Sequence, residues 1–453
     1  MERKFIEFYK VTNIVSKRVS PLDLEARKYY VDLSPVIGNE VEKIHDKIII
    51  TGQHEPTCTV LTGYIDSGKS TELLRLKHKL EVAGFHVVYF EAYEDLDMIQ
   101  VSIAHIWLAI ACRIVQSLET IEIKTPKKLN KFLQESLQIF YFDVQEEIKE
   151  AISKNVRLKL GKDGDIFTWC IEMREVIKNS QKKSFFYQPL SQFWNSQKSE
   201  LIEAINQELI EPLVTQIKAQ GKQGLVVIGE GLDGIYNIRL PGGQVQTEYL
   251  FVDQGEYLTK LNCHVVYTLP ISLVFSNHYE MLTQHFGELR VLPMVPVRSR
   301  EGQEHQEGMA RLRQLVLIKA FPELDEQQRL EAISLVFENA EALDRLCRIS
   351  GGHIRNLAGL LYRCVMEGED FSFPLKRQAL EKVIDSYKED LRAAINEEEW
   401  ELLREVKTSQ MVKIGDSKYQ MLIRSMFVLK YGDGNQEWFD INPVLSEAEE
   451  MQK

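Results

Sequence analysis

One eight-residue stretch constrains the fold of this chain more than any other. Residues 63–70 read Gly-Tyr-Ile-Asp-Ser-Gly-Lys-Ser and satisfy the pattern G-x-x-x-x-G-K-[ST] in full. Glycines let the backbone wrap so that N–H groups point at a phosphate, the lysine reaches the terminal phosphates, and the hydroxyl after it holds Mg²⁺. The pattern predicts a phosphate-binding loop made of Gly63, Tyr64, Ile65, Asp66, Ser67, Gly68, Lys69, Ser70 and Thr71.

The residues around this loop agree with that prediction. Before it, "CTVLT" predicts a buried strand; after it, "STELLRLKHKLEVAG" has helical apolar spacing and ends at Gly84. "FHVVYFEAY" then predicts a second strand. A strand, a loop and a helix whose N-terminus faces the phosphates are what anion binding requires, whereas a chance match on a surface loop would lack these neighbours. We therefore expect ATP and Mg²⁺ as ligands.

Composition sets limits on the class of protein. The chain has 453 residues, which is enough for two or three domains, and 44% hydrophobic content is typical of a globular protein. A formal net charge of -12 argues against a nucleic-acid binder, which usually shows a basic face. The six cysteines lie far apart without any CxxC pair, which favours reduced thiols over a disulfide framework or a zinc site.

The apolar segments predict a cytoplasmic protein without a membrane segment. The N-terminal residues "MERKFIEFYKVTNIVSKRVS" lack the apolar core of a signal peptide. The most apolar stretch, "VSIAHIWLAIACRIV", contains His105 and is too short to span a bilayer. It is typical of a buried helix.

A second motif supplies acids for the metal. In "QGLVVIGEGLDGIY" an apolar strand, residues 225–228, is followed by Glu230 and Asp233. A nucleotide site of this kind needs an acid at the end of a buried strand to orient Mg²⁺. Ser70 and Glu230 are the candidate metal-binding residues, and a glycine-rich turn without such a role is the alternative. The helix predicted before this strand gives the alternation of a parallel α/β sheet.

At this motif the chain resembles the signal-transduction ATPases with numerous domains (STAND), a branch near the AAA+ and origin-recognition ATPases. These often carry an apolar strand followed by Asp-(Gly/Asp)-Leu-Asp, where this chain has Glu-Gly-Leu-Asp. Glu230 stands where the metal-orienting aspartate would be. An alternative register puts Gly229 on that aspartate and Glu230 on the catalytic base. In either register one acid of the usual two is lost or displaced, so the resemblance implies nucleotide binding with weak or slow hydrolysis.

The resemblance implies further site residues. On the strand predicted in "LNCHVVYTLPISLVFS", Thr268 matches a polar residue that contacts the γ-phosphate or its water. The fifth predicted strand, in "ELRVLPMVPVR", has Arg290 before it and Arg298 after it. Either arginine matches a phosphate-sensing residue that reaches across to a neighbouring subunit; a solvated strand flank is the alternative.

Two more segments match the same ATPases. "SGGHIRNLAGLL" resembles their Gly-Gly-x-x-Arg-x-Leu signature, with Arg355 in the first turn of a lid helix that closes on the γ-phosphate. "VIGNEVEKIHDKI" resembles an apolar-Gly-Arg-Glu box that lies against the base and sugar. Gly38 and Glu40 match that box, but Asn39 replaces its arginine. Contacts to the base are therefore less firmly implied than contacts to the phosphates.

Three regions follow from these motifs. We predict an AAA+/STAND-like α/β domain with a parallel sheet over residues 1–299, with a helical insertion at about 115–210, and an all-helical lid over residues 300–372. We also predict a winged-helix-like domain over residues 373–453, with a hairpin that turns at Asp433-Gly434. Over residues 371–453 there are 12 Lys+Arg and 16 Asp+Glu, so the net charge is 12 - 16 = -4. This balance favours docking to protein or autoinhibition over reading DNA.

The implied function is an ATP-governed molecular switch in signalling or regulated assembly. It would self-associate and act with a separate effector or sensor protein in trans. A DNA-associated ATPase resembling origin-recognition proteins is the first alternative, with nucleic acid open as a partner but not favoured. A nucleotide-binding scaffold without hydrolysis is the second alternative.

Overall fold

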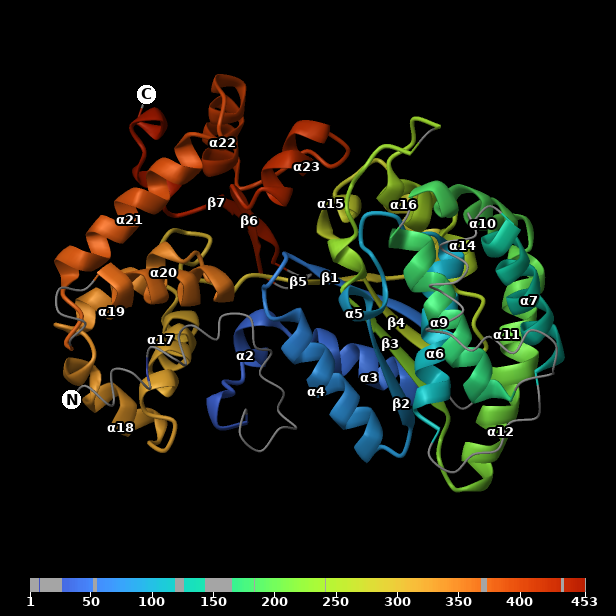
Figure 1. The fold of residues 1–453 in the computed structure, drawn as a ribbon. Coiled ribbons are helices and arrows are strands. Elements are labelled where there is room, and N and C mark those ends of the chain that lie inside the picture. The colour runs from blue at the N-terminus through green and yellow to red at the C-terminus, as the bar shows by residue number, and fades with distance from the viewer. Residues whose placement is uncertain are drawn as a thin grey trace.

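The computed structural model describes residue 8 and residues 27–51, 55–118, 126–142, 165–182, 184–240, 242–367, 373–432 and 436–452. Figure 1 shows two lobes side by side, one built around a β-sheet and one mainly helical, with the short strands β6 and β7 near their junction. The sheet lobe contains the phosphate loop, so its construction determines the site.

The sheet lobe is organised by five parallel strands in the order β2-β3-β4-β1-β5. β1 therefore lies between β4 and β5, and β4 separates it from β3. The strands are β1 (Cys58–Gly63), β2 (His86–Glu91), β3 (Leu225–Glu230), β4 (His264–Pro270) and β5 (Leu289–Leu292). Parallel neighbours need crossover connections, which the helices between them supply.

Helices cover both faces of this sheet, as Figure 1 shows with α3 and α4 on one side and α6 and α9 on the other. The longer helices of the sheet lobe are α3 (Glu40–Thr51), α4 (Lys69–Val82), α6 (Ile103–Gln116), α7 (Lys127–Phe142), α9 (Ile166–Lys182), α10 (Ser184–Ser196), α11 (Lys198–Ile205), α12 (Glu211–Ala219) and α16 (Tyr279–Phe286). The shorter ones are α2 (Ser34–Ile37), α5 (Ala92–Asp95), α13 (Gln246–Glu248), α14 (Gly255–Leu258) and α15 (Ile271–Val274).

The strands are buried on both faces, because their alternate side chains enter two different cores. Leu61 and Ile228 pack with α3, α4 and the helical lobe, whereas Val60 and Val227 pack with α6 and the inserted helices. This is the near-continuous apolar strand that a doubly covered parallel sheet produces. The first of the two cores continues into the helical lobe without interruption.

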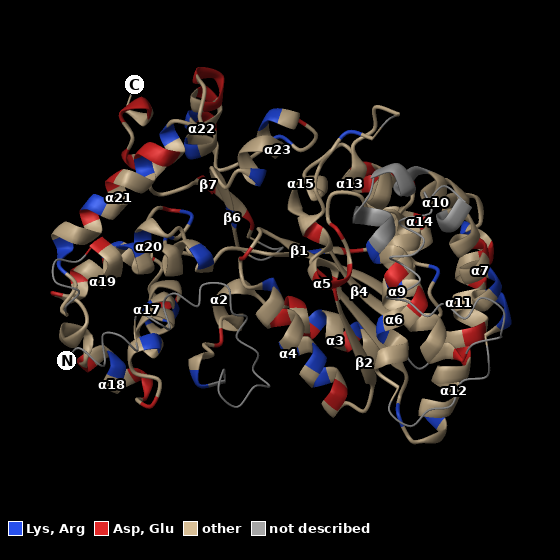
Figure 2. Cartoon of the chain, in the orientation of Figure 1, with Lys and Arg blue, Asp and Glu red and all other residues tan. Residues whose placement is uncertain are grey.

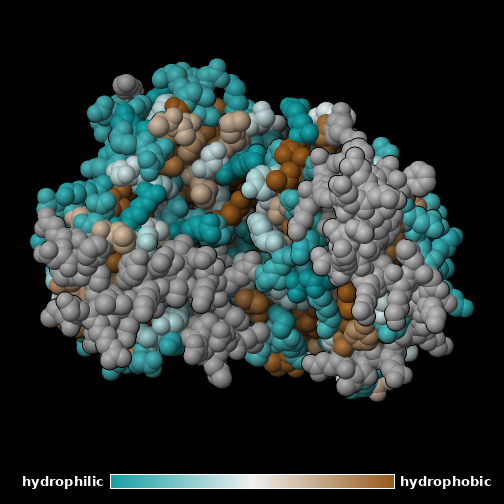
Figure 3. All heavy atoms as spheres, viewed as in Figure 1, coloured by the Kyte–Doolittle hydropathy of each residue, from teal (hydrophilic) through white to brown (hydrophobic). Residues whose placement is uncertain are grey.

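We describe the helical lobe in two parts, which we call the lid and the C-terminal module. The lid has α17 (Gln306–Ala320), α18 (Glu326–Glu331), α19 (Ala340–Ile349) and α20 (Ile354–Glu367). The C-terminal module has α21 (Arg377–Arg392), α22 (Glu397–Ser409), α23 (Ser417–Arg424) and the antiparallel strands β6 (Val428–Tyr431) and β7 (Trp438–Ile441). On the face drawn in Figure 3, apolar side chains gather where the lobes meet, and the outer surface of the described residues is mainly hydrophilic.

The predicted α/β P-loop fold with helical regions is confirmed. The described part of the insertion is helical, while residues 119–125, 143–164 and 183 of it lie outside the described residues. The predicted turn at Asp433-Gly434 also lies outside them, between the two strands of the observed hairpin. The boundaries at residues 299/300 and 372/373 stay predictions, as does the winged-helix character of the last region. Among the described helices, none combines the length and apolarity needed to cross a membrane.

Candidate nucleotide-binding site

The predicted site residues meet at one edge of the sheet, because parallel strands bring their carboxyl ends together. Gly63 at the end of β1 lies opposite Pro270 of β4 and Leu292 of β5. Glu230 at the end of β3 lies opposite Glu91 of β2. The phosphate loop, residues 63–70, therefore leaves β1 at the same edge as the acids that follow β3.

The loop is tightly packed at its two glycines. A Cβ on Gly63 would lie 3.0 Å from the carbonyl oxygen of Leu292. Gly68 has φ 102°, which L side chains rarely adopt, and a Cβ there would lie 2.8 Å from Cδ1 of Ile354 in the lid. Asp66 between them also has a positive φ, of 61°. The close contact at Gly63 and the positive φ at Gly68 explain why the motif needs glycine at these two positions.

Lys69 begins α4 and points back into the loop. Its Nζ donates to the carbonyl oxygen of Gly63 at 3.0 Å and to that of Tyr64 at 2.5 Å. It also forms an ion pair with Oδ2 of Asp233 at 3.0 Å. The Lys69 and Asp233 side chains are only 7% and 10% exposed, so this pair is shielded from solvent.

The hydroxyl and the acid predicted to bind metal are in direct contact. Oγ of Ser70 donates to Oε1 of Glu230, and the phenol of Tyr89 on β2 donates to Oε2 of the same carboxylate. The Ser70 contact favours the register in which Glu230, rather than Gly229, takes the metal-orienting position. The metal-binding role of Ser70 and Glu230 stays a prediction.

Thr268 is buried on β4, opposite Leu61 of β1. Its Oγ1 accepts a hydrogen bond from the backbone N–H of Asp233 at 3.4 Å. Asp233 itself lies in the 3-10 turn Leu232–Gly234 that follows β3. The threonine thus fixes the turn that carries the acid, and its predicted contact with the γ-phosphate is untested.

These residues fit a magnesium nucleotide. Oγ of Ser67 is buried without a hydrogen-bond partner, in the loop where phosphate oxygens would accept one. Ser70 and Glu230 together present a hydroxyl and a carboxylate, the oxygen ligands that Mg²⁺ prefers. Within the described ranges no three His, Cys, Asp or Glu side chains group to hold a metal unaided. Magnesium at a phosphate site does not require such a group, because the phosphates complete its coordination.

The arginine predicted to sense phosphate from β5 is engaged elsewhere. Nη1 of Arg290 bonds Oε2 of Glu40 at 3.1 Å, and Nη2 bonds Oε2 of Glu288 at 2.7 Å. Its side chain is buried within this chain, between β5 and the start of α3, rather than a solvated flank of the strand. In this arrangement Arg290 does not extend toward a neighbouring subunit, and a sensing role for it would require release from Glu40. Arg298 is exposed.

Gly38, the match to the base-contacting box, ends α2 with φ 82°. Glu40 of the same box begins α3 and is the buried partner of Arg290. The box is therefore joined to β5 beside the phosphate loop. Its predicted contact with the nucleotide base stays a prediction.

The lid lies directly on the phosphate loop through His353, Ile354 and Arg355. Nε2 of His353 bonds the carbonyl oxygen of Ile65 at 2.8 Å, and Nδ1 accepts the N–H of Asn356. Burial lowers the pKa of His353, so the ring is neutral with its proton on Nε2. Nη1 of Arg355 pairs with Oδ2 of Asp66 at 2.6 Å. The arginine of the glycine signature thus reaches the phosphate loop from the lid.

The C-terminal module also reaches the loop. The buried hydroxyl of Tyr64 donates to the carbonyl oxygen of Val428 on β6 at 3.0 Å. Two residues further along β6, the carbonyl of Lys430 accepts the N–H of Met294 at 2.9 Å. Alternate carbonyls of an antiparallel strand point away from its partner, so β6 pairs with β7 on one edge and with the sheet lobe on the other.

Sequence reasoning missed the contacts that join distant parts of the chain. The sequence did not predict the bond from Tyr89 to Glu230. It also did not predict that Tyr64 contacts the hairpin or that His353 contacts the loop. Tyr89 alternates with apolar residues on β2, which gives no indication of a polar function. Tyr64 occupies a variable position of the motif, and its partner lies at the other end of the chain.

Comparison with known proteins gives a likeness in fold. No protein-family model and no curated protein matches the chain. It is similar to the ORC2 protein of Aeropyrum pernix, described in ADPNP–ADP complexes, at 12% identity over 91% of each chain and a TM-score of 0.40. It is similar to Cdc6p of Pyrobaculum aerophilum at 11% identity, over 94% of this chain and 96% of that one, with a TM-score of 0.38. The ORC1 protein of Aeropyrum pernix in complex with DNA matches at 12% identity over 95% and 96%, with a TM-score of 0.36.

Proposed function

We propose that this chain binds ATP with Mg²⁺ at the phosphate loop and works as a nucleotide-dependent conformational switch. The loop N–H groups and Lys69 would hold the phosphates, while Ser70 and Glu230 would orient the metal. When bound, Mg²⁺ would neutralise part of the negative charge of the phosphates.

The observation that carries the proposal is the set of contacts made by consecutive loop residues. Tyr64 bonds the C-terminal hairpin, Ile65 bonds His353, and Asp66 pairs with Arg355. Gly68 lies against Ile354. A loop that shifts to admit phosphates must therefore alter its contacts with both the lid and the C-terminal module. Differential contacts of this kind are what allow a ligand to shift a conformational equilibrium.

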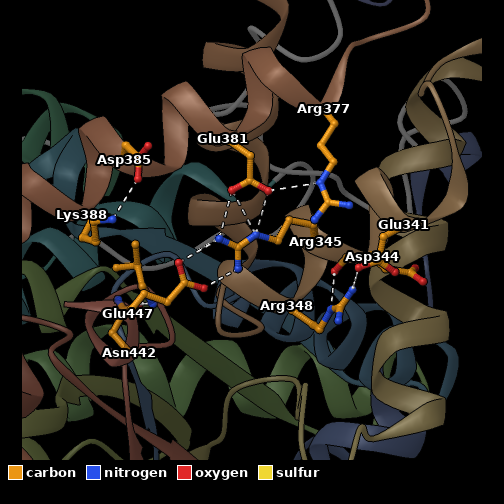
Figure 4. A network of polar contacts seen from close by, with 11 residues as sticks. Glu341, Asp344, Arg345, Arg348, Arg377, Glu381, Asp385, Lys388, Asn442 and Glu447 are labelled. Atoms are coloured by element: carbon orange, nitrogen blue, oxygen red, sulfur yellow. Dashed lines mark hydrogen bonds and ion pairs between the residues drawn. The ribbon is translucent and has the colours of Figure 1, made fainter. Parts of the chain in front are cut away.

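The lid and the C-terminal module are themselves joined by ion pairs, shown in Figure 4. Arg345 of α19 contacts Glu381 of α21 at 3.1 Å and also Glu447 near the C-terminus. Within α21, Arg377 also pairs with Glu381 at 3.5 Å, which holds the Glu381 carboxylate beside Arg345. Tyr431 of β6 adds a hydrogen bond to the carbonyl of Gly351, before α20, at 2.9 Å. These contacts support movement of the lid and the module as one unit.

Two measurements test this switch. The Lys69→Ala variant should lose ATP binding while keeping its fold, because it removes the ammonium and leaves the rest of the loop. Measurement of size with and without a non-hydrolysable ATP analogue should show ATP-dependent assembly. Unchanged ATP affinity in Lys69→Ala would refute the assignment of the loop.

Hydrolysis is expected to be slow, because Glu230 is the one acid among the described residues that bonds Ser70, and its other oxygen is bonded to Tyr89. The Glu230→Gln variant should lower turnover further while ATP remains bound. Tight binding with unchanged turnover in that variant would remove the hydrolytic role. A scaffold without hydrolysis would show binding and no turnover in the parent protein.

A DNA-associated ATPase is the second candidate function. The observation on its side is the order of a P-loop domain, a lid, and a module of helices with a hairpin; DNA is also the partner named for one protein of similar fold. Against it stands the acidic C-terminal module: Figure 2 shows acidic residues on α22, whose first turn is Glu397, Glu398 and Glu399. ATP-dependent retention on duplex DNA at about 0.1 M salt would favour this candidate, since phosphate contacts survive moderate salt only when several are made.

A further inference from the structure

The carboxylate of Asp233 occupies one of the three N–H donors of Lys69, the lysine of the phosphate loop. A lysine ammonium has three N–H groups. In this structure those of Lys69 are directed to the carbonyls of Gly63 and Tyr64 and to the carboxylate of Asp233. A phosphate oxygen can bond Lys69 only after one of these partners is displaced. Asp233 is the only charged partner of the three.

The turn that carries Asp233 is held firmly in place. Leu232 before it is fully buried, and the N–H of Asp233 bonds Thr268. The ring of Tyr93 covers the turn: a Cβ on Gly231 would lie 2.8 Å from Cδ2 of Tyr93, and one on Gly234 would lie 1.6 Å from its hydroxyl oxygen. The two glycines are therefore needed for the ring to cover the turn. Such support keeps the carboxylate close to Lys69 instead of leaving it in solvent.

We propose that Asp233 is an internal counter-ion that competes with nucleotide phosphate for Lys69 and so sets the concentration of nucleotide at which the site fills. The inference rests on the proposed function and adds a regulatory element to the same site. The Lys69–Asp233 pair is nearly buried. Phosphate would therefore replace one shielded anion with another, and the balance depends on how well each anion bonds Lys69. Any movement of the Tyr93-covered turn that withdraws Asp233 would raise nucleotide affinity.

The Asp233→Asn variant tests this inference, with ATP affinity measured in EDTA so that metal binding does not contribute. Asparagine keeps the shape of the side chain and removes the charge, so phosphate becomes the sole anionic partner of Lys69. We expect ATP to bind at least about tenfold tighter than to the parent protein. The matched control is Glu230→Gln, which removes a charge at the same edge from a side chain that bonds Ser70 and Tyr89 instead of Lys69. Its gain in affinity should be several-fold smaller.

A second measurement guards against loss of fold. Inorganic pyrophosphate should raise the thermal unfolding temperature of Asp233→Asn more than that of the parent protein, and Asp233→Ser should behave in the same way. Equal or weaker metal-free ATP affinity in both Asp233 variants would overturn the inference. Such failure of the Asp233 variants would leave the proposed function intact, provided that the parent binds ATP and Lys69→Ala does not. If Lys69→Ala binds ATP like the parent, or the parent does not bind it at all, the proposed function fails and the inference with it.

Discussion

The hydrogen bond between Tyr64 and Val428 is the most direct link between the phosphate loop and the C-terminal module. Val428 faces Ile441 across the hairpin, and the flanking bond runs from the N–H of Asn442 to the carbonyl of Phe427. Val428 and Ile441 therefore form a non-hydrogen-bonded pair of the ladder. The carbonyl of Val428 points away from β7 and accepts a hydrogen bond from the Tyr64 hydroxyl. The Tyr64→Phe variant removes this partner while keeping the ring.

The expected cost follows from burial. The Tyr64 ring is 1% exposed, and Val428 is fully buried. A buried carbonyl that loses its hydrogen-bond partner destabilises a protein by about 1–3 kcal/mol. We expect Tyr64→Phe to lower the free energy of unfolding by that amount. We also expect faster amide hydrogen exchange along β6, because the strand loses the hydrogen bond from Tyr64 and keeps the one from Met294 to the sheet lobe.

Urea unfolding and hydrogen exchange together measure these two effects. Tyr236→Phe is the matched control, because Tyr236 is 59% exposed. A change of less than about 0.5 kcal/mol for Tyr64→Phe, with unaltered exchange in β6, would be the size expected of an ordinary surface substitution. That result would refute the reasoning that the loop holds the hairpin.

Three further predictions concern the loop, the lid and a buried histidine. Gly68→Ala should destabilise by about 1–3 kcal/mol because φ is 102°, whereas Gly359→Ala, with open space in α20, should stabilise slightly; equal effects in urea unfolding would contradict this. Arg345→Ala should loosen the lid from the C-terminal module and increase proteolysis between them, while Arg363→Ala, whose pair with Asp390 is exposed, should change stability by less than about 1 kcal/mol. Burial lowers the pKa of His105 to about 3, so its stabilising contribution is complete above pH 6.5 and is lost as the pH falls toward 3. His105→Gln keeps a capping-box residue for Ser102 and should reduce the pH slope of unfolding in that window by about 1.4 kcal/mol per unit; an unchanged slope would exclude His105 as the source.

The phosphate loop and its flanking strand and helix could be predicted because their information is local. Glycine spacing, an apolar run before it and 3.6-residue periodicity after it all lie within one short segment. The acid after β3 could be found for the same reason, since an apolar strand ends at Glu230. The meeting of Glu230 with Ser70 follows once the sheet is parallel, because both lie at its carboxyl edge.

The contacts between modules could not be predicted, since they depend on how distant surfaces pack. Arg290 shows this limit: its position beside a strand matched a sensing arginine, but its burial against Glu40 is decided by the placement of α3 on β5. Tyr64 is a variable position of the motif, and only the folded chain brings Val428 to it. Asp233 was predicted as an acid near the expected metal site, while its pairing with Lys69 depends on a turn covered by Tyr93.

The central claim is that a nucleotide at the phosphate loop changes the contacts of both the lid and the C-terminal hairpin. Hydrogen exchange of residues 351–357 and 428–431, compared with and without saturating Mg-ATP, measures both contacts in one experiment. The account predicts that ATP alters exchange in both segments of the parent protein and in neither segment of Lys69→Ala. Exchange that stays the same in both segments while ATP is bound would contradict it.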